Sequence, residues 1–85
     1  ADIPLALAQR LVIEANRRDM SIRTLRQSGR IPHLVQARWE IAATLRAERD
    51  PEVPTRPRFS LPEIGRALNR DHSTVLAGLR RVGAA

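Results

Sequence analysis

The sequence contains no cysteine, no tyrosine and no lysine, and only one tryptophan and one phenylalanine. Without cysteine it can form neither a disulfide framework nor a thiolate metal site, and nothing indicates an oxidising compartment. With so few aromatic residues, the core must be built from aliphatic side chains. No apolar run approaches the roughly 20 residues that span a bilayer. We therefore expect a single small domain over residues 1–85, located in the cytoplasm.

Residue groupings that carry catalysis or metal chemistry are also missing. The sequence has no Gly-rich phosphate loop, no Ser/His/Asp arrangement and no pair of carboxylates that marks an active site. Its histidines, His33 and His72, have no cysteine or second histidine at ligand spacing. We therefore expect neither an enzyme nor a bound metal or cofactor.

Positive charge is what the sequence has in excess. The net charge is +6 at pH 7, the isoelectric point is about 11.7, and all fifteen basic residues are arginine. This excess predicts attraction to a polyanion such as nucleic acid, and the attraction should weaken as salt rises. Arginine forms paired hydrogen bonds with phosphate and guanine better than lysine does. A GC-rich genome, however, would favour arginine codons without any role in binding.

Prolines and small polar residues divide the chain into about five helices without strands. Pro4 opens a first helix, which ends in the charged run 16–19. Ser21 caps a short second helix, and Pro32 begins the longest one. The basic loop 26–33 separates these two helices, because its Gln, Ser and Gly residues are typical of a turn.

Apolar residues recur at helical spacing in the first and the longest helix, and we expect them to face the core. In the first helix this stripe is Leu5, Ala8, Leu11, Val12 and Ala15. In the longest it is Leu34, Ala37, Ile41, Ala42 and Leu45, with Arg38 and Arg46 off the stripe and Trp39 packed at its edge. The segment 50–58, DPEVPTRPR, holds three prolines and so predicts an exposed connector.

Residues 60–82 predict two short helices joined by a tight turn. Ser60 caps the first while Glu63 reaches back to the Ser60 backbone, and Pro62 occupies the first turn, where a missing N–H costs nothing. Asp71 caps the second. Helices joined so closely cross steeply, which leaves the start of the second projecting, as a major-groove reader requires. The apolar faces are Ile64, Ala67 and Leu68 in the first helix and Val75, Leu76, Leu79 and Val82 in the second.

The residues at the projecting end have the chemistry of base readers; they are Arg70, Asp71, His72, Ser73 and Thr74. Asp71 can accept from a cytosine amino group, Thr74 can offer its methyl to thymine, and Arg70 can reach phosphate or guanine. The plainer alternative is that Asp71 is only an N-cap and that His72 is a solvated polar residue. For Asp71 the two roles can coexist.

The string SLPEIG, followed after a few residues by RDHSTV, resembles the signature of the C-terminal DNA-binding domain of the bacterial replication initiator DnaA. The segment VQARWEIAATLRAE resembles a family helix ahead of it, with Arg38 matching an arginine of that motif. The resemblance covers most of the chain, and residues 60–75 match with high specificity. It implies an all-α fold of about five helices, similar to the Trp repressor and DnaA domain IV, with a C-terminal helix-turn-helix.

The resemblance also implies which residues contact DNA. Asp71, His72, Ser73 and Thr74 are implied to face bases in the major groove, and an arginine of the basic loop enters the adjacent minor groove. Arg30 is the best candidate for that arginine, and His33 is the alternative. The residues expected at the DNA backbone are Leu61, Pro62, Arg38, Arg66, Arg70 and, from the connector, Arg58.

Three departures from the family pattern limit what it implies. Leu68 and Asn69 stand where the family has a Gly-containing turn, and the connector is several residues longer than the usual link. No ATP-binding module is present in these residues. We therefore predict sequence-specific binding of double-stranded DNA at DnaA-box-like sites, in the initiation or regulation of replication, by a nucleoid-associated monomer with replication proteins as further partners.

Two other functions stay open on the sequence. One is a small helix-turn-helix transcriptional regulator with a different target site. The other is a membrane- or protein-interaction module that uses the apolar stripe and basic end of the first helix, LALAQRLVIEANRR. Against the second stands the simpler expectation that this stripe packs against the longest helix.

Overall fold

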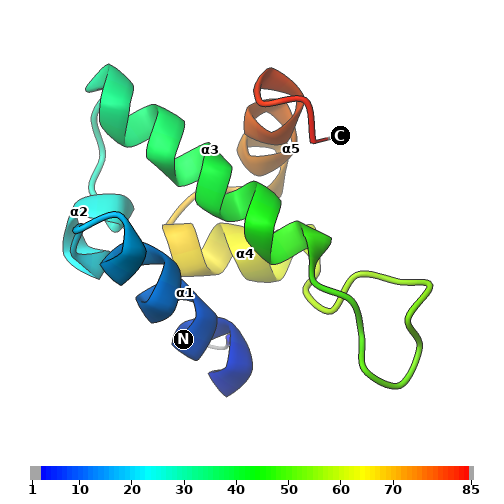
Figure 1. Ribbon diagram of the computed structural model, residues 1–85. Coiled ribbons are helices and arrows are strands. Elements are labelled where there is room, and N and C mark those ends of the chain that lie inside the picture. The colour runs from blue at the N-terminus through cyan, green and yellow to red at the C-terminus, as the bar shows by residue number, and fades with distance from the viewer. Residues whose placement is uncertain (1–2, 85) are drawn as a thin grey trace.

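The computed structural model describes residues 3–84, and within this range it contains five α-helices and no strand (Figure 1). The helices are α1 (Leu5–Arg17), α2 (Ile22–Arg26), α3 (Pro32–Ala47), α4 (Leu61–Leu68) and α5 (His72–Arg81). The predicted all-α fold of about five helices is therefore confirmed. The long helix α3 and the short helix α4 each contact all the other described helices, so the fold is assembled on this pair.

Side-chain caps from Ser21, Ser60 and Asp71 begin α2, α4 and α5, as the sequence predicts. At α4, Ser60 Oγ accepts from the Glu63 N–H at 3.2 Å, and Glu63 Oε1 accepts from the Ser60 N–H at 2.8 Å. Each cap satisfies an N–H group that has no partner within its helix and contributes about 1 kcal/mol. These starts were predictable because each depends on residues three apart in the chain.

The core is aliphatic apart from Trp39 and Phe59. Fully burying a Leu, Ile, Val or Phe side chain contributes roughly 1.5–3 kcal/mol relative to leaving it exposed. All five helices and the end of the connector supply residues to this one cluster. Its members are Leu7, Leu11, Ala15, Leu25, Trp39, Ile41, Ala42, Leu45, Phe59, Ile64, Ala67, Leu68, Val75 and Leu79.

The buried face of α1 differs from the predicted stripe. Leu5 and Val12, both expected in the core, are 73% and 46% exposed. Leu7 and Glu14, which were not part of the stripe, are buried instead. The helix is thus turned about its axis relative to the prediction, because α3, α2 and α4 together enclose a different side of it.

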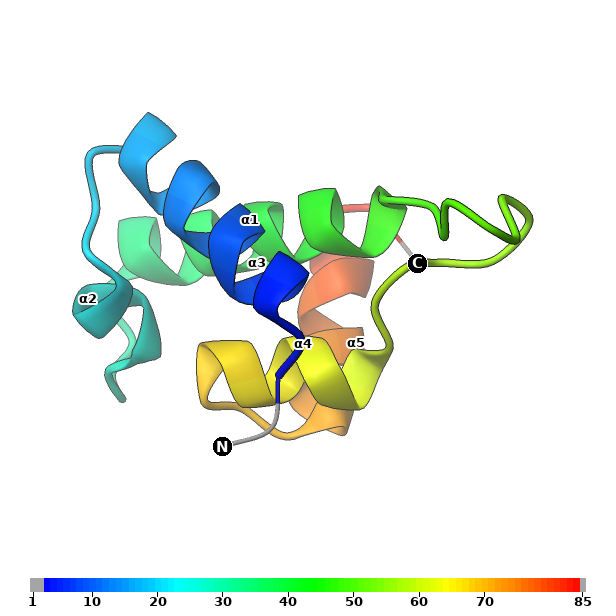
Figure 2. The same cartoon turned by 90° about the horizontal axis from the view of Figure 1, so that it is seen from below.

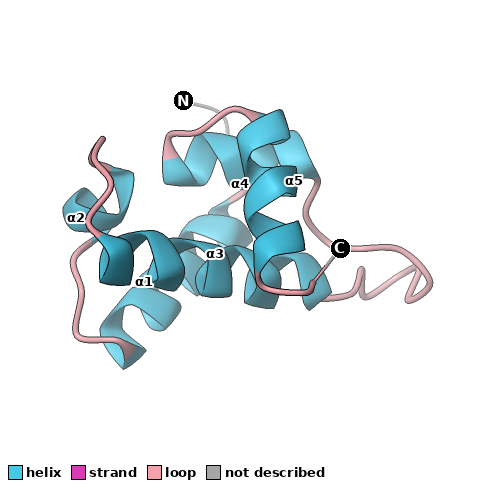
Figure 3. Ribbon diagram, turned by 90° about the horizontal axis from the view of Figure 1, so that it is seen from above, coloured by secondary structure: helices cyan, strands magenta, loops and turns pink. Residues whose placement is uncertain are grey.

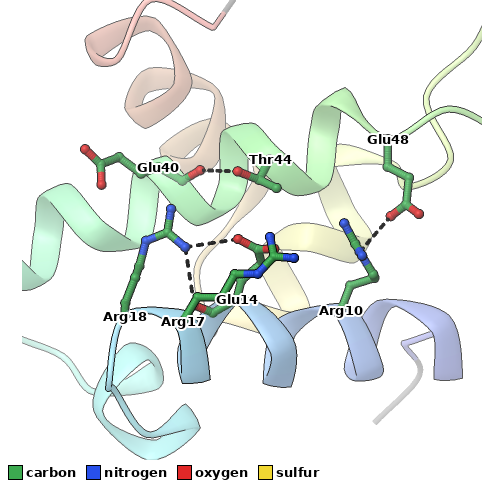
Figure 4. A network of polar contacts seen from close by, with 7 residues as sticks. All are labelled: Arg10, Glu14, Arg17, Arg18, Glu40, Thr44 and Glu48. Carbon is green, nitrogen blue, oxygen red and sulfur yellow. Dashed lines mark hydrogen bonds and ion pairs between the residues drawn. The ribbon is translucent and has the colours of Figure 1, made fainter.

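Glu14 can be buried because two arginines neutralise it (Figure 4). Arg17 Nη1 lies 2.9 Å from Glu14 Oε2, and Arg18 Nη1 lies 3.0 Å from Glu14 Oε1. A carboxylate is rarely buried unless it is paired in this way. The apolar pattern could not reveal this face, because a lone glutamate in a helix is typical of the surface.

Arg38 is the second departure from the predicted packing. It was expected off the stripe of α3, but its side chain is only 3% exposed. Its guanidinium closes the end of α2, since Nε donates to the Leu25 carbonyl at 2.9 Å and Nη2 donates to the Gln27 carbonyl at 3.3 Å. Of the predicted stripe, Ile41, Ala42 and Leu45 are buried, and Leu34 and Ala37 are half-buried.

A three-residue turn, 69–71, joins α4 to α5 at a steep angle (Figure 1). The Arg70 N–H donates to the Gly65 carbonyl at 2.7 Å, and a Cβ on Gly65 would collide with the Arg70 carbonyl oxygen. Glycine is therefore required for this approach. Asn69 adopts the left-handed conformation with φ 57° and ψ 45°, which asparagine tolerates better than most residues. Asn69 thus makes the turn without a glycine, although a glycine is usual at this turn in the DnaA family, which the sequence resembles.

Gly78 is where α5 packs on α3. Figure 3 shows α5 lying across α3. A Cβ on Gly78 would collide with three carbon atoms of the Trp39 indole ring. The two helices therefore meet through a flat ring and a residue without a side chain. The predicted stripe of α5 is buried at Val75 and Leu79 and half-buried at Leu76 and Val82.

The connector forms a loop that is closed by its own hydrogen bonds. Of the predicted exposed connector 50–58, all residues are exposed except Asp50 and Pro57, which are half-buried. At the base of the loop, the Arg58 N–H donates to the Glu48 carbonyl at 2.8 Å and the Asp50 N–H donates to the Arg56 carbonyl at 3.0 Å. Figures 1 and 2 show the loop at the end of the molecule opposite α2.

Replacing Gly78 with alanine should destabilise the fold. The new methyl group must displace the Trp39 ring, and such overpacking costs roughly 1–3 kcal/mol, more than the roughly 1 kcal/mol by which alanine exceeds glycine in a helix. Urea unfolding followed by circular dichroism measures the change. In a Trp39→Leu background, where the ring is gone, the same substitution should be neutral or stabilising. An unchanged free energy of unfolding for Gly78→Ala alone would show that this contact does not position α5.

Candidate nucleic-acid interface

The four predicted base readers lie together at the start of α5. Asp71 is the N-cap, His72, Ser73 and Thr74 form the first turn, and all four are exposed. Asp71 Oδ1 accepts from the Thr74 N–H at 3.1 Å, so Asp71 is an N-cap in this structure. A carboxylate has about four lone-pair sites, and the cap therefore leaves acceptor capacity for a base amino group.

The environment of Asp71 keeps its carboxyl charged. Hydrogen bonds from the side chain and then from the backbone N–H of Thr74 lower the pKa of Asp71. Desolvation opposes them by a smaller amount, and the neighbouring His72 adds a still smaller lowering. A charged carboxylate is a hydrogen-bond acceptor only, which suits the amino group of cytosine. The positive end of the α5 dipole also favours this carboxylate and any phosphate nearby.

The residues predicted to reach DNA from α4 have different exposures. Pro62 and Arg66 are exposed, whereas Leu61 is half-buried. Pro62 and Arg66 are four residues apart and so share one face of the helix. One face of α4 therefore offers one charged and one apolar exposed contact.

The basic loop 26–33 is tied to the turn that precedes α5. Arg70 Nη2 donates to the Gln27 carbonyl, with 2.6 Å between the two atoms, and Asn69 Nδ2 donates to the Arg26 carbonyl at 3.3 Å. Both hydrogen bonds join residues 43 positions apart in the chain. The loop and the helix-turn-helix therefore form one unit, which the sequence did not indicate.

Arg38 and Arg70 both donate to the Gln27 carbonyl, and we call these three residues the loop latch. Arg70 Nη1 also donates to the carbonyls of Asn69, at 2.9 Å, and Leu68, at 3.2 Å. Burial lowers the pKa of Arg38, and the adjacent charge of Arg70 lowers it further. Both arginines were predicted at the DNA backbone. In the structure their guanidinium groups donate to backbone carbonyls of the protein. Any contact with DNA would therefore be made in addition to these hydrogen bonds.

A groove of about 980 Å³ lies between the basic loop and α5. Four arginines line it, and they are Arg30, Arg38, Arg70 and Arg81. Thr74 lines it too, so this arginine groove reaches the first turn of α5. None of its lining residues is acidic. A cleft with charge of one sign focuses the electric field, so the arginine groove favours a phosphate group.

Arg81 is the lining residue that the sequence analysis missed. It follows Thr74 by seven residues, which is two helical turns, so both side chains lie on the same face of α5. That spacing would have identified it. The prediction stopped at Thr74 because the resemblance to the family signature ends at Val75.

The structure separates Arg30 from His33, the two candidates for a minor-groove contact. Both are exposed. Arg30 lines the arginine groove together with Thr74, whereas His33 lines a separate hollow beside Met20 and Thr24. The position of Arg30 is therefore the one that continues the surface formed by the start of α5.

Arg58, the predicted DNA contact in the connector, does not line the arginine groove. It pairs with Glu48, with 3.2 Å between Nη1 and Oε1, and its guanidinium lies 5.5 Å from the centre of the Phe59 ring. Arg56 likewise pairs with Asp50 at 3.0 Å. The connector is at the opposite end of the molecule from α2 and is not part of the arginine groove (Figure 1).

Two kinds of arrangement are absent from residues 3–84. In this range no three His, Asp or Glu side chains gather in a way that could hold a metal ion, and no helix has the length and apolar character needed to cross a membrane.

Comparisons of the chain with protein-family models, curated proteins and solved structures give no match.

Replacing Arg70 with lysine should loosen the basic loop without unfolding the protein. Lysine keeps the charge, but its compact ammonium group cannot reproduce the planar fork that donates to three carbonyls. We expect faster amide hydrogen exchange over residues 27–31 and a nearly unchanged midpoint of thermal unfolding. Arg80→Lys, at an exposed position of α5, is the matched control and should leave the loop unchanged. Equal exchange rates in both variants would contradict the role of the latch.

Proposed function

We propose that this chain binds double-stranded DNA sequence-specifically and as a monomer, with the start of α5 in the major groove and Arg30 in the adjacent minor groove. One observation carries the proposal: two exposed elements, the α5 start and the basic loop, flank a single groove lined by four arginines. The loop latch holds these elements in a fixed relation. Binding therefore does not have to order the loop, and this lowers the entropic cost of association.

The electrostatics of the arginine groove support the same arrangement. A phosphate backbone separates the major groove from the adjacent minor groove, so it must pass between the two reading elements. The arginine groove occupies that place, and contacts there fix register and orientation without reading sequence. Together with the net charge of +6, they predict a strong nonspecific component that weakens with salt.

The resemblance to the DnaA domain points to a DnaA-box-like target, used to initiate or regulate replication. Asp71 favours cytosine and Thr74 favours thymine at the positions they face. A transcriptional regulator with another target would use the same geometry. Binding measurements on defined duplexes distinguish the two.

Fluorescence anisotropy tests the proposal with a labelled duplex that carries one DnaA-box sequence. A scrambled duplex of equal composition is the control, and both are measured across a salt series. We expect a preference of at least about tenfold, or about 1.4 kcal/mol, that persists as salt rises. Equal affinities that collapse together at high salt would rule out the DnaA-box target. A two-fold symmetric footprint with half-sites about 34 Å apart would contradict monomeric binding.

The substitution Asp71→Asn separates capping from base reading. Asparagine caps helices about as well as aspartate, so the stability of the variant should stay close to that of the parent. Its amide nitrogen adds donors, however, which weakens a contact that needs a pure acceptor for cytosine. We expect a loss of roughly 1–3 kcal/mol on the preferred duplex and little change on the scrambled one.

Asp71→Ala is the companion variant, because it removes the cap and the acceptor together. It should lose stability as well as base preference. If Asp71→Asn weakens binding to both duplexes equally, Asp71 does not read a base.

A further inference from the structure

The apolar stripe of α1 is wider than the surface that the fold covers. Leu5 and Val12 lie two turns apart on this helix and remain 73% and 46% exposed. Ala8, between them, is half-buried. Because the helix is turned toward Leu7, one edge of its apolar stripe is left at the surface. Contiguous apolar surface on a small protein marks an interaction site or a liability to aggregate.

Val12 belongs to a preformed hollow and is not an isolated surface residue. It lines a groove of about 240 Å³ whose apolar walls include Ala8 from α1, Ile22 from α2 and Ala67 from α4. These three helices contact one another in pairs, so the walls are set by the core packing. We call this surface the α1–α4 groove. It shares no lining residue with the arginine groove.

The charged residues at the α1–α4 groove have one sign. They are Arg26 and Arg66, and both are exposed. Arg26 Nη2 donates to the Arg66 carbonyl at 3.4 Å, which keeps the end of α2 beside α4. The groove therefore has an apolar floor and two arginines at its edge.

We propose that the α1–α4 groove binds an amphipathic helix of a partner protein, whose acidic residues pair with Arg26 and Arg66. An apolar hollow between packed helices accepts the apolar face of a further helix, with anchors at i, i+3, i+4 and i+7 spacing. Arginine pairs with carboxylates through two parallel hydrogen bonds, so acidic residues beside these anchors complete the fit. A second copy of this chain is disfavoured, because each copy carries a net charge of +6.

The substitution Val12→Glu tests the proposal, and Ile13→Glu is its matched control. Val12 and Ile13 are adjacent apolar residues of α1 with similar exposure, 46% and 41%, but Ile13 does not line the groove. Each substitution lowers the net charge by one, so general attraction of an acidic peptide falls equally in both. Arg66 is left unchanged because it also belongs to the predicted DNA contacts.

The probe is a fluorescein-labelled helical peptide of about 16 residues, with leucines at i, i+3, i+4 and i+7 spacing and glutamates beside them. Anisotropy is measured in the absence of DNA, so the result does not depend on the proposed DNA function. We expect saturable binding that Val12→Glu weakens at least tenfold and Ile13→Glu weakens less than twofold. Val12→Gln, which adds no charge, should give an intermediate loss. Circular dichroism confirms that each variant is folded.

Several outcomes would overturn the proposal. Equal binding of a peptide with lysines in place of the glutamates would show that the partner does not need acidic residues. Equal losses for Val12→Glu and Ile13→Glu, or no binding by the parent chain, would show that the α1–α4 groove is not a binding site for such a helix. Self-association that Val12→Glu abolishes would make the occupant a second copy. Co-sedimentation with anionic vesicles that depends on Val12 would make the occupant a lipid surface.

Discussion

The contact between the Trp39 ring and Gly78 fixes the place of α5, and the proposed function depends on where α5 points. A flat ring against a residue without a side chain lets α5 and α3 approach more closely than any larger pair would allow. The same device recurs between α4 and the turn, where Gly65 admits the Arg70 carbonyl. Two glycine contacts thus hold the start of α5 at the surface, while the middle of the helix is in the core.

The loop latch extends this rigidity to a segment that has no regular structure. Each guanidinium offers five N–H donors in a fixed plane, so Arg38 and Arg70 can satisfy carbonyls that a helix or sheet would otherwise pair. Two like charges meet at one carbonyl as a result. An anion in the arginine groove would screen their repulsion.

The sequence predicted whatever depends on near neighbours in the chain. The caps at Ser21, Ser60 and Asp71 and the exposure of Pro51 and Pro54 in the connector follow from local chemistry, and the structure contains them. The buried faces of α1 and α3 were only partly predicted, because Glu14 and Arg38 are buried through partners that an apolar pattern does not contain. Burial of a charge is a tertiary event, decided by which groups come to lie opposite it.

The candidate interface divides in the same way. The four predicted base contacts, Asp71 to Thr74, are consecutive in the chain, so the sequence alone could identify them. Arg81 follows from helical spacing within α5, whereas the contact of Arg70 with Gln27 depends on how distant segments meet, and no spacing rule within the chain encodes it. The family signature that the sequence resembles is a continuous string of residues. It therefore gives no information on contacts between segments that are distant in the chain.

The connector closes on itself, and this makes its length independent of the rest of the molecule. Its ends meet where the Arg58 N–H donates to the Glu48 carbonyl, and Glu48 also lies 3.4 Å from Arg10 Nε of α1 (Figure 4). Beyond the loop, Phe59 is buried and its carbonyl accepts from Arg46 at 2.8 Å. The junction between α3 and α4 is therefore held from outside the loop. Doubling the length of the loop would cost only about 0.6 kcal/mol in closure entropy, so its tip is a natural attachment point for a fluorophore or a fused domain.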